Sequence, residues 1–251
     1  MVCLYQHGRH MDPRPIKRLG IIGDLHGEHQ RLELALDWFA SQQIDAVVCT
    51  GDIADGRGCI NRSCELLRQA DVHTVAGNHD RWLLTDKARH VNDAHRREEL
   101  SDENLDYLAG LPRQRRLDTS GGPLMLCHGI ADNDLAKVWP GRRPEEVERS
   151  AELDAVLETG QYRYLINGHM HFRVVIDFFG LTLLNAGTLR GEHAGLSVVD
   201  FEEDSISAYT SYDEKPPERL VEKTLAPCEQ RRIWRNTQEF DGTWTPVTLH
   251  V

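Results

Sequence analysis

Three short apolar runs in the first eighty residues each end in a turn of small and polar residues, and this alternation is the strongest constraint on the fold. The runs cover residues 18–22, 45–50 and 72–76. Between them, residues 28–41 and 61–70 carry apolar side chains at helical spacing. Strand, polar turn and helix in repeated order predict a parallel sheet with right-handed crossovers. The polar turns should therefore share one edge of that sheet, where open α/β sheets place their functional groups.

The second half of the chain changes character. Glycine-containing turns between apolar runs predict hairpins over residues 115–127, 173–184 and 196–209. A helix beginning near Pro144 and ending near Gly160, followed by a buried strand at 162–166, is predicted between the first two hairpins. Parallel strands in the first half of the chain and hairpins in the second half predict sheets that contain both parallel and antiparallel strands.

The length of 251 residues suits one α/β domain. Residues 1–15 are polar and contain two prolines, so we expect a disordered leader there. The predicted elements fall within residues 16–212, which form the expected domain. Residues 213–251 combine two adjacent prolines, many charges and scattered tryptophans, which predicts a tail whose order the sequence leaves open.

The formal net charge of -11 argues against a sequence-independent grip on long nucleic acids, which depends on many Lys and Arg side chains. A substrate carrying phosphate would need metal ions or a local basic patch to offset that charge. The six cysteines form no CxxC pair, so we interpret them as reduced thiols of a cytoplasmic protein. No apolar run reaches transmembrane length, and we expect no membrane association. The oligomeric state is left open.

Five polar blocks supply Asp, Asn and His side chains at predicted strand ends. They are Asp24-Leu25-His26, Gly51-Asp52, Asn78-His79-Asp80, His128-Gly129 and His169-Met170-His171. Carboxylate and imidazole ligands suit Mn²⁺, Fe, Co, Ni or Zn²⁺, and the lack of Cys among them argues against a closed structural zinc site. Two cations about 3.5–4 Å apart serve in-line displacement at phosphorus, and they need a carboxylate to bridge them. The blocks therefore predict a two-metal centre.

The ordered set GDLHG, GDIAD, GNHD, CHG and GHMH resembles the calcineurin-like metallophosphoesterase superfamily over about residues 18–200. The resemblance implies an α/β fold, a four-layer αββα sandwich of two mixed β-sheets. The chain most closely resembles the small bacterial branch with GDxHG, NHD and GHxH, often described as phosphodiesterases. It implies a metal-dependent phosphoric ester hydrolase with two divalent metal ions, Mn²⁺ above all, and a small phosphate-ester substrate.

The resemblance also implies roles for individual residues. One metal would be held by Asp24, His26 and His171, the other by Asn78, His128 and His169, with Asp52 bridging the two. His79 resembles the histidine that protonates the leaving group, and Asp80 the carboxylate that orients this histidine. A hydroxide bridging the metals would attack phosphorus in line.

Two departures from the family pattern bear on the substrate. Calcineurin-like serine/threonine phosphatases carry phosphate-clamping arginines where this chain has Gly56 and Ala76, which argues against protein phosphatase activity. Arg57 and Arg81 lie close by in the sequence and are candidate substitutes. Asp55 either braces the loop that contains it or acts in catalysis, and the sequence does not choose between these roles.

Alternative functions are a phosphomonoesterase or a dinucleoside-polyphosphate hydrolase. An alternative of another class is a metal-free scaffold of the same fold, which would lack ligands or the proton donor. In this chain all seven ligand positions and His79 are filled.

Overall fold

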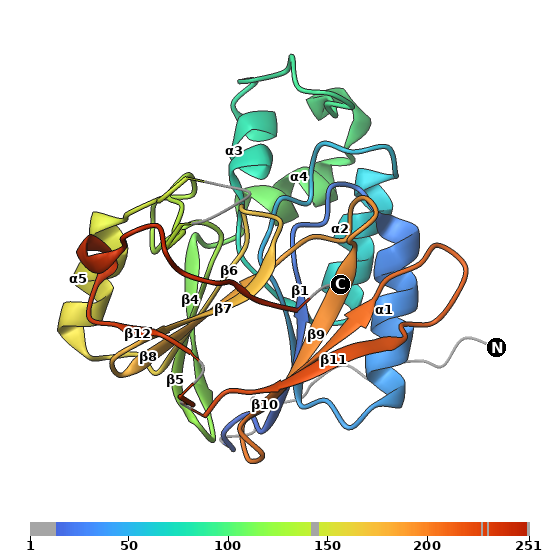
Figure 1. Cartoon of the computed structure of the whole chain (residues 1–251). Helices are drawn as coiled ribbons and strands as arrows, with labels where there is room; N and C mark the ends of the chain where they lie inside the picture. The colour runs from blue at the N-terminus through green and yellow to red at the C-terminus, as the bar shows by residue number, and fades with distance from the viewer. Residues whose placement is uncertain (1–13, 142–145, 227, 230, 250–251) are drawn as a thin grey trace.

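Two mixed β-sheets pack face to face, and helices cover their outer faces, as Figure 1 shows. The structure is a computed structural model that describes residues 14–141, 146–226, 228–229 and 231–249. The expected fold class, a four-layer αββα sandwich, is confirmed. The leader expected over residues 1–15 lies outside the described residues as far as residue 13.

The first sheet has the strand order β11-β10-β9-β1-β2-β3. Its parallel strands are β1 (Arg18–Ile22), β2 (Ala46–Cys49) and β3 (His73–Thr74). Its antiparallel part consists of β9 (Gly195–Asp200), β10 (Ser205–Thr210) and β11 (Arg219–Thr224). The parallel arrangement predicted for the first half of the chain is confirmed.

The second sheet has the strand order β12-β7-β8-β6-β5-β4. Its parallel centre is formed by β5 (Gly122–Cys127), β6 (Tyr164–Asn167) and β8 (Leu181–Ala186). Antiparallel neighbours flank this centre, namely β4 (Gln114–Thr119) beside β5 and β7 (Arg173–Phe178) beside β8. The short strands β12 (Ile233–Trp234) and β13 (Val247–Thr248) both pair with β7.

The alternation of side chains along a strand builds the layers. In β1, Leu19 and Ile21 pack between the two sheets, whereas Ile22 faces the helices. The outer face of the first sheet is covered by α1 (His29–Ser41), α2 (Ile60–Gln69) and α4 (Asp102–Ala109). Helix α5 (Ala151–Thr159) covers the second sheet. No helix in the described part of the chain is both long and apolar enough to cross a membrane.

Helix α5 begins later than the sequence predicts. Pro144, the expected first residue, lies outside the described residues, and residues 146–150 are not helical. An antiparallel bridge between Trp139 and Glu148, with N–H to O distances of 2.9 and 2.8 Å, keeps this stretch extended. The Ser150 hydroxyl then accepts the Leu153 N–H at 3.2 Å and caps the helix.

The tail expected after residue 212 is part of the domain wherever it is described. Strand β11 extends the first sheet, while β12 and β13 lie against β7 of the second. Trp234 and Phe240 are buried with α5 in the outer layer. The described fold therefore continues across the expected boundary at residue 212.

Replacing Trp234 with Ala should lower the free energy of unfolding by about 3–5 kcal/mol, because the change removes a large, fully buried side chain. Urea unfolding measures the loss. Arg235→Ala, next to it, removes an exposed side chain and should change stability by less than about 1 kcal/mol. Equal stability of Trp234→Ala and the wild type would contradict the integration of the tail.

Candidate metal centre

The predicted ligands follow the carboxyl ends of parallel strands in both sheets. Asp24, Asp52 and Asn78 come after β1, β2 and β3, while His128 and His169 come after β5 and β6. Parallel neighbours end at the same edge, and the two packed sheets bring these edges together.

The predicted ligands form two groups, in each of which the candidate ligand atoms lie within 4.8 Å of one another. The first group is Asp24, His26, Asp52 and His171, and the second is Asp52, His128 and His169. Asp52 belongs to both. Asn78 joins the second group, because its Oδ1 lies 2.9 Å from His128 Nε2. The structure thus gathers all seven residues, with Asp52 in the shared position.

Hydrogen bonds behind two of the imidazoles point their other nitrogen into the centre. Nδ1 of His26 lies 3.0 Å from the carbonyl oxygen of Asp55, and Nδ1 of His128 lies 2.8 Å from that of Thr50. A carbonyl only accepts, so each Nδ1 carries hydrogen and each ring turns its Nε2 toward the centre, where this nitrogen can bind a metal once it carries no proton.

Those Nε2 atoms face other groups that can bind a metal. His26 Nε2 lies 3.0 Å from Nε2 of His171, and His128 Nε2 lies 3.2 Å from Asp52 Oδ2. These converging nitrogen and oxygen atoms share a positive charge, either as a proton on a ring nitrogen or as a divalent cation that would replace it. The residues therefore fit the metal ions that this donor set favours.

Charge and burial make the centre attract cations. Although burial disfavours the imidazolium, the carboxylates of Asp52 and Asp24 raise the pKa of His128 to about 10. Burial would raise the pKa of Asp52, yet His128 and His26 hold it below its usual range. Burial together with His128 lowers the pKa of His169 to about 4, which keeps this ring neutral as a metal ligand must be.

Five residues of the centre and its rim have left-handed backbones. The φ angles of His26, Asp52, Asp55, His169 and His171 lie between 44 and 68°. Residues other than glycine rarely adopt this region, because it costs about 1–2 kcal/mol per residue. Bonds within the centre hold the turns, including His26 N–H to Asp52 O at 2.7 Å and His169 N–H to Asp24 Oδ2 at 2.8 Å. Such strain, held in place by surrounding bonds, is typical of functional sites.

His79 lies beside the centre and belongs to neither ligand group. Its backbone N–H donates to Asp52 Oδ1 at 2.8 Å, and its ring centroid is 5.0 Å from that of His26. Nδ1 of His79 lies 2.7 Å from Oδ2 of Asp55. Asp55 is therefore the carboxylate that orients His79.

The prediction that Asp80 orients His79 is wrong. Asp80 accepts the backbone N–H groups of Ile53, Ala54 and Gly77 at 2.9, 3.0 and 2.9 Å. Residues 77–80, expected to be a turn, instead lead into helix α3 (Asn78–Leu84). Neighbouring residues of a helix point about 100° apart, so Asp80 faces the loop after β2 while His79 faces the centre. The role of Asp80 is to brace that loop.

The structure explains the missing arginine at residue 56 and places the two candidate substitutes. A Cβ atom on Gly56 would lie 1.6 Å from the carbonyl oxygen of His26, so no larger residue fits there. Arg81 is engaged by Asp134, with its Nε and Nη2 at 2.6 and 2.8 Å from the two carboxylate oxygens. Arg57 lies 3.5 Å from Asp93 at the exposed surface. Neither candidate substitute is a free phosphate clamp.

The chain belongs to the calcineurin-like phosphoesterase superfamily, whose family model matches residues 18–204. It is 24% identical over 178 residues to the uncharacterised protein MJ0912 of Methanocaldococcus jannaschii, covering 68% of this chain and 69% of that protein.

Solved structures share the fold. YfcE, a phosphoesterase from E. coli, matches 83% of this chain and 99% of its own, with a TM-score of 0.52 and 18% identity. The hypothetical protein PH1004 from Pyrococcus horikoshii matches 78% of this chain and 89% of its own, with a TM-score of 0.60 and 14% identity.

Elemental analysis of the purified protein should find about two divalent metal ions per chain. Asp52→Asn should reduce this to about one or less, because the only carboxylate common to both groups loses its charge. Asp86→Asn is the matched control, since Asp86 is exposed and asparagine tolerates its left-handed backbone. Full metal content in Asp52→Asn would contradict the shared role.

Proposed function

We propose that the protein is a phosphodiesterase that uses two divalent metal ions, Mn²⁺ above all, to hydrolyse a small phosphate diester. The observation that carries the proposal is the shared position of Asp52 between two ligand groups, with His79 beside them and held by Asp55. Membership of a phosphoesterase superfamily supports the reaction class. The complete and gathered ligand set favours an enzyme over a metal-free scaffold.

Asp24, His26 and His171 would hold one ion, and Asn78, His128 and His169 the other, with Asp52 common to both. When bound, the two ions would activate water and stabilise the charge that develops on the phosphoryl oxygens.

His79 is the proposed proton donor to the leaving-group oxygen. Burial lowers its pKa, but the hydrogen bond to Asp55 and the charge of Asp52 outweigh burial and raise it. With Nδ1–H committed to Asp55, Nε2 carries the transferable proton. Asp55 is the proposed orienting residue.

The charge around the centre favours a diester substrate. A diester carries one negative charge, whereas a monoester approaches two at neutral pH. The candidate clamp residues Arg57 and Arg81 are each paired with a carboxylate. A diester, with its lower charge, depends less than a monoester on an additional positively charged side chain.

Purified protein with Mn²⁺ should hydrolyse bis-p-nitrophenyl phosphate, with release of p-nitrophenolate followed by absorbance. Asp52→Asn and His128→Ala should abolish turnover, because the first removes the charge of the shared carboxylate and the second removes an imidazole ligand. Asp86→Asn should retain the wild-type rate. Turnover that survives both ligand changes would refute the two-metal proposal, and a metal-free, inactive wild type would favour the scaffold.

His79→Ala should slow substrates with poor leaving groups most, by about 10²-fold, since these need a proton in the transition state. Hydrolysis of diphenyl phosphate and bis-p-nitrophenyl phosphate should be compared, because phenolate is the poorer leaving group. An equal loss on both esters would argue against proton donation.

The rate of the wild type on p-nitrophenyl phosphate should lie below its rate on bis-p-nitrophenyl phosphate, and the reverse order would favour a phosphomonoesterase.

A further inference from the structure

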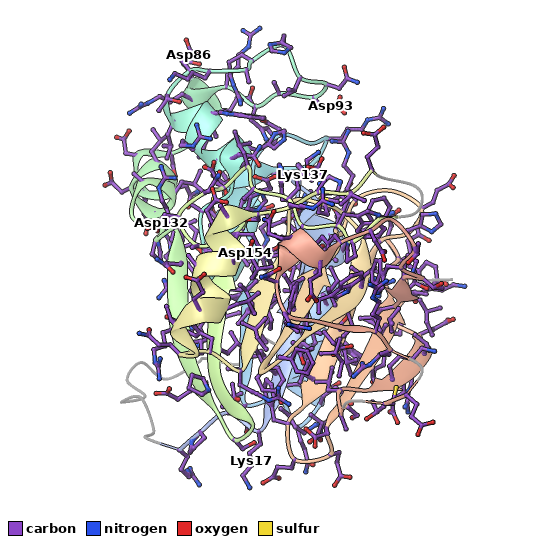
Figure 2. The ribbon with its side chains drawn as sticks, turned by 60° about the vertical axis from the view of Figure 1, so that its left-hand side comes forward. Lys17, Asp86, Asp93, Asp132, Lys137 and Asp154 are labelled. Carbon is purple, nitrogen blue, oxygen red and sulfur yellow. The ribbon has the colours of Figure 1, made fainter. Side chains whose placement is uncertain are left out.

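Residues 85–100 form an excursion between helices α3 and α4, at the top of the molecule in Figure 1. Figure 2 shows Asp86 and Asp93 at this end and Lys17 at the opposite end. Asp93 connects the excursion to two loops near the metal centre, through Arg57 at 3.5 Å and Arg190 at 3.3 Å. Arg190 follows closely on Thr188, whose hydroxyl donates to the carbonyl of Asp24.

Arg89 reaches from this excursion to Asp55. Its Nη1 lies 2.8 Å from Asp55 Oδ1 and its Nη2 lies 2.9 Å from Asp55 Oδ2, a bidentate pair. Two further donors are engaged by the excursion itself, with Nε 2.8 Å from Lys87 O and Nη1 2.9 Å from His95 O. The guanidinium is therefore held on both sides, and its planar fork fixes the plane of the carboxylate.

His95 adds a second connection to the same residue. Its backbone N–H donates to Asp55 Oδ1 at 3.0 Å, and its Nδ1 accepts the Asp55 N–H at 2.9 Å. Each oxygen of Asp55 thus accepts two hydrogen bonds, and the second bond on Oδ2 is the one from His79. Three of these four bonds come from the excursion. Asp55 itself has a left-handed backbone.

We propose that Arg89 is a positioning residue for the reaction, holding Asp55 so that Asp55 holds His79. This inference rests on the proposed function. The excursion over residues 85–100 then serves as a brace for the proton donor, and Arg89 is its point of contact. An arginine that only anchored the excursion would support the fold without a selective effect on proton donation.

The test uses Arg89→Ala and Arg89→Lys, with Arg96→Ala as the matched control. Lysine keeps the charge but loses the bidentate fork. Arg96 lies on the same excursion, and its exposed side chain gives the same loss of charge. Thermal unfolding of each variant measures any effect on stability separately.

With Mn²⁺, Arg89→Ala should lower kcat on diphenyl phosphate by about tenfold or more and on bis-p-nitrophenyl phosphate by less than about threefold. Arg89→Lys should show the same selectivity, and Arg96→Ala should match the wild type. In a His79→Ala background, Arg89→Ala should have no further effect, because residues that act as a unit are not additive. Equal losses on the two esters, or an undiminished loss in that background, would overturn the proposal.

A spectroscopic readout does not depend on activity. In protein loaded with diamagnetic Zn²⁺ and labelled with ¹⁵N-histidine, the Nδ1–H resonance of His79 is assigned by its absence from His79→Ala. It should disappear through solvent exchange in Arg89→Ala and persist in Arg96→Ala. An unchanged resonance in Arg89→Ala would overturn the proposal. A wild type that hydrolyses neither ester would contradict the proposed function, while this resonance would still decide the role of Arg89.

Discussion

Two buried carboxylates at one edge of the sandwich set the requirement that the rest of the site meets. Asp24 and Asp52 are both essentially inaccessible to solvent, and such charges are costly unless they are paired and hydrogen-bonded. The Thr50 hydroxyl and the His169 N–H donate to Asp24, and the His79 N–H donates to Asp52. Imidazoles complete the surroundings, and a bound cation would balance the remaining negative charge. The fold therefore builds a buried acidic site that is suited to divalent metal ions.

The geometry of the site combines residues from both sheets and requires strained backbone conformations. His169 and His171 lie in the turn between β6 and β7 and reach different ligand groups of the centre. The left-handed φ angles of 66 and 59° at these two residues achieve that turn. Close packing keeps the neighbouring loops in place, and Gly56 is the clearest case because even a methyl group there would collide with His26. The same contact leaves no room for an arginine side chain at residue 56.

Two parts of the chain support the centre of the fold in different ways. The segment beyond residue 204, outside the family match, adds β10 and β11 to one sheet and β12 and β13 to the other, so it contributes to both layers of strands. The excursion over residues 85–100 lies inside the family match and reaches Asp55 through Arg89 and His95. The first segment is held by apolar burial, whereas the second contacts Asp55 through charged hydrogen bonds.

From the sequence alone the fold class and the seven candidate ligands could be predicted, because the strand-end blocks that carry the family resemblance are local patterns. The sequence also separated His79 from the ligands. Only the tertiary structure decided which carboxylate meets His79, since Asp80 is adjacent in sequence but points elsewhere on a helix, while Asp55 comes from another loop. The start of α5, the integration of the tail and the Arg89 contact were decided there as well. Each depends on specific pairing that local periodicity does not encode, and for the tail and Arg89 the paired residues lie far apart in the chain.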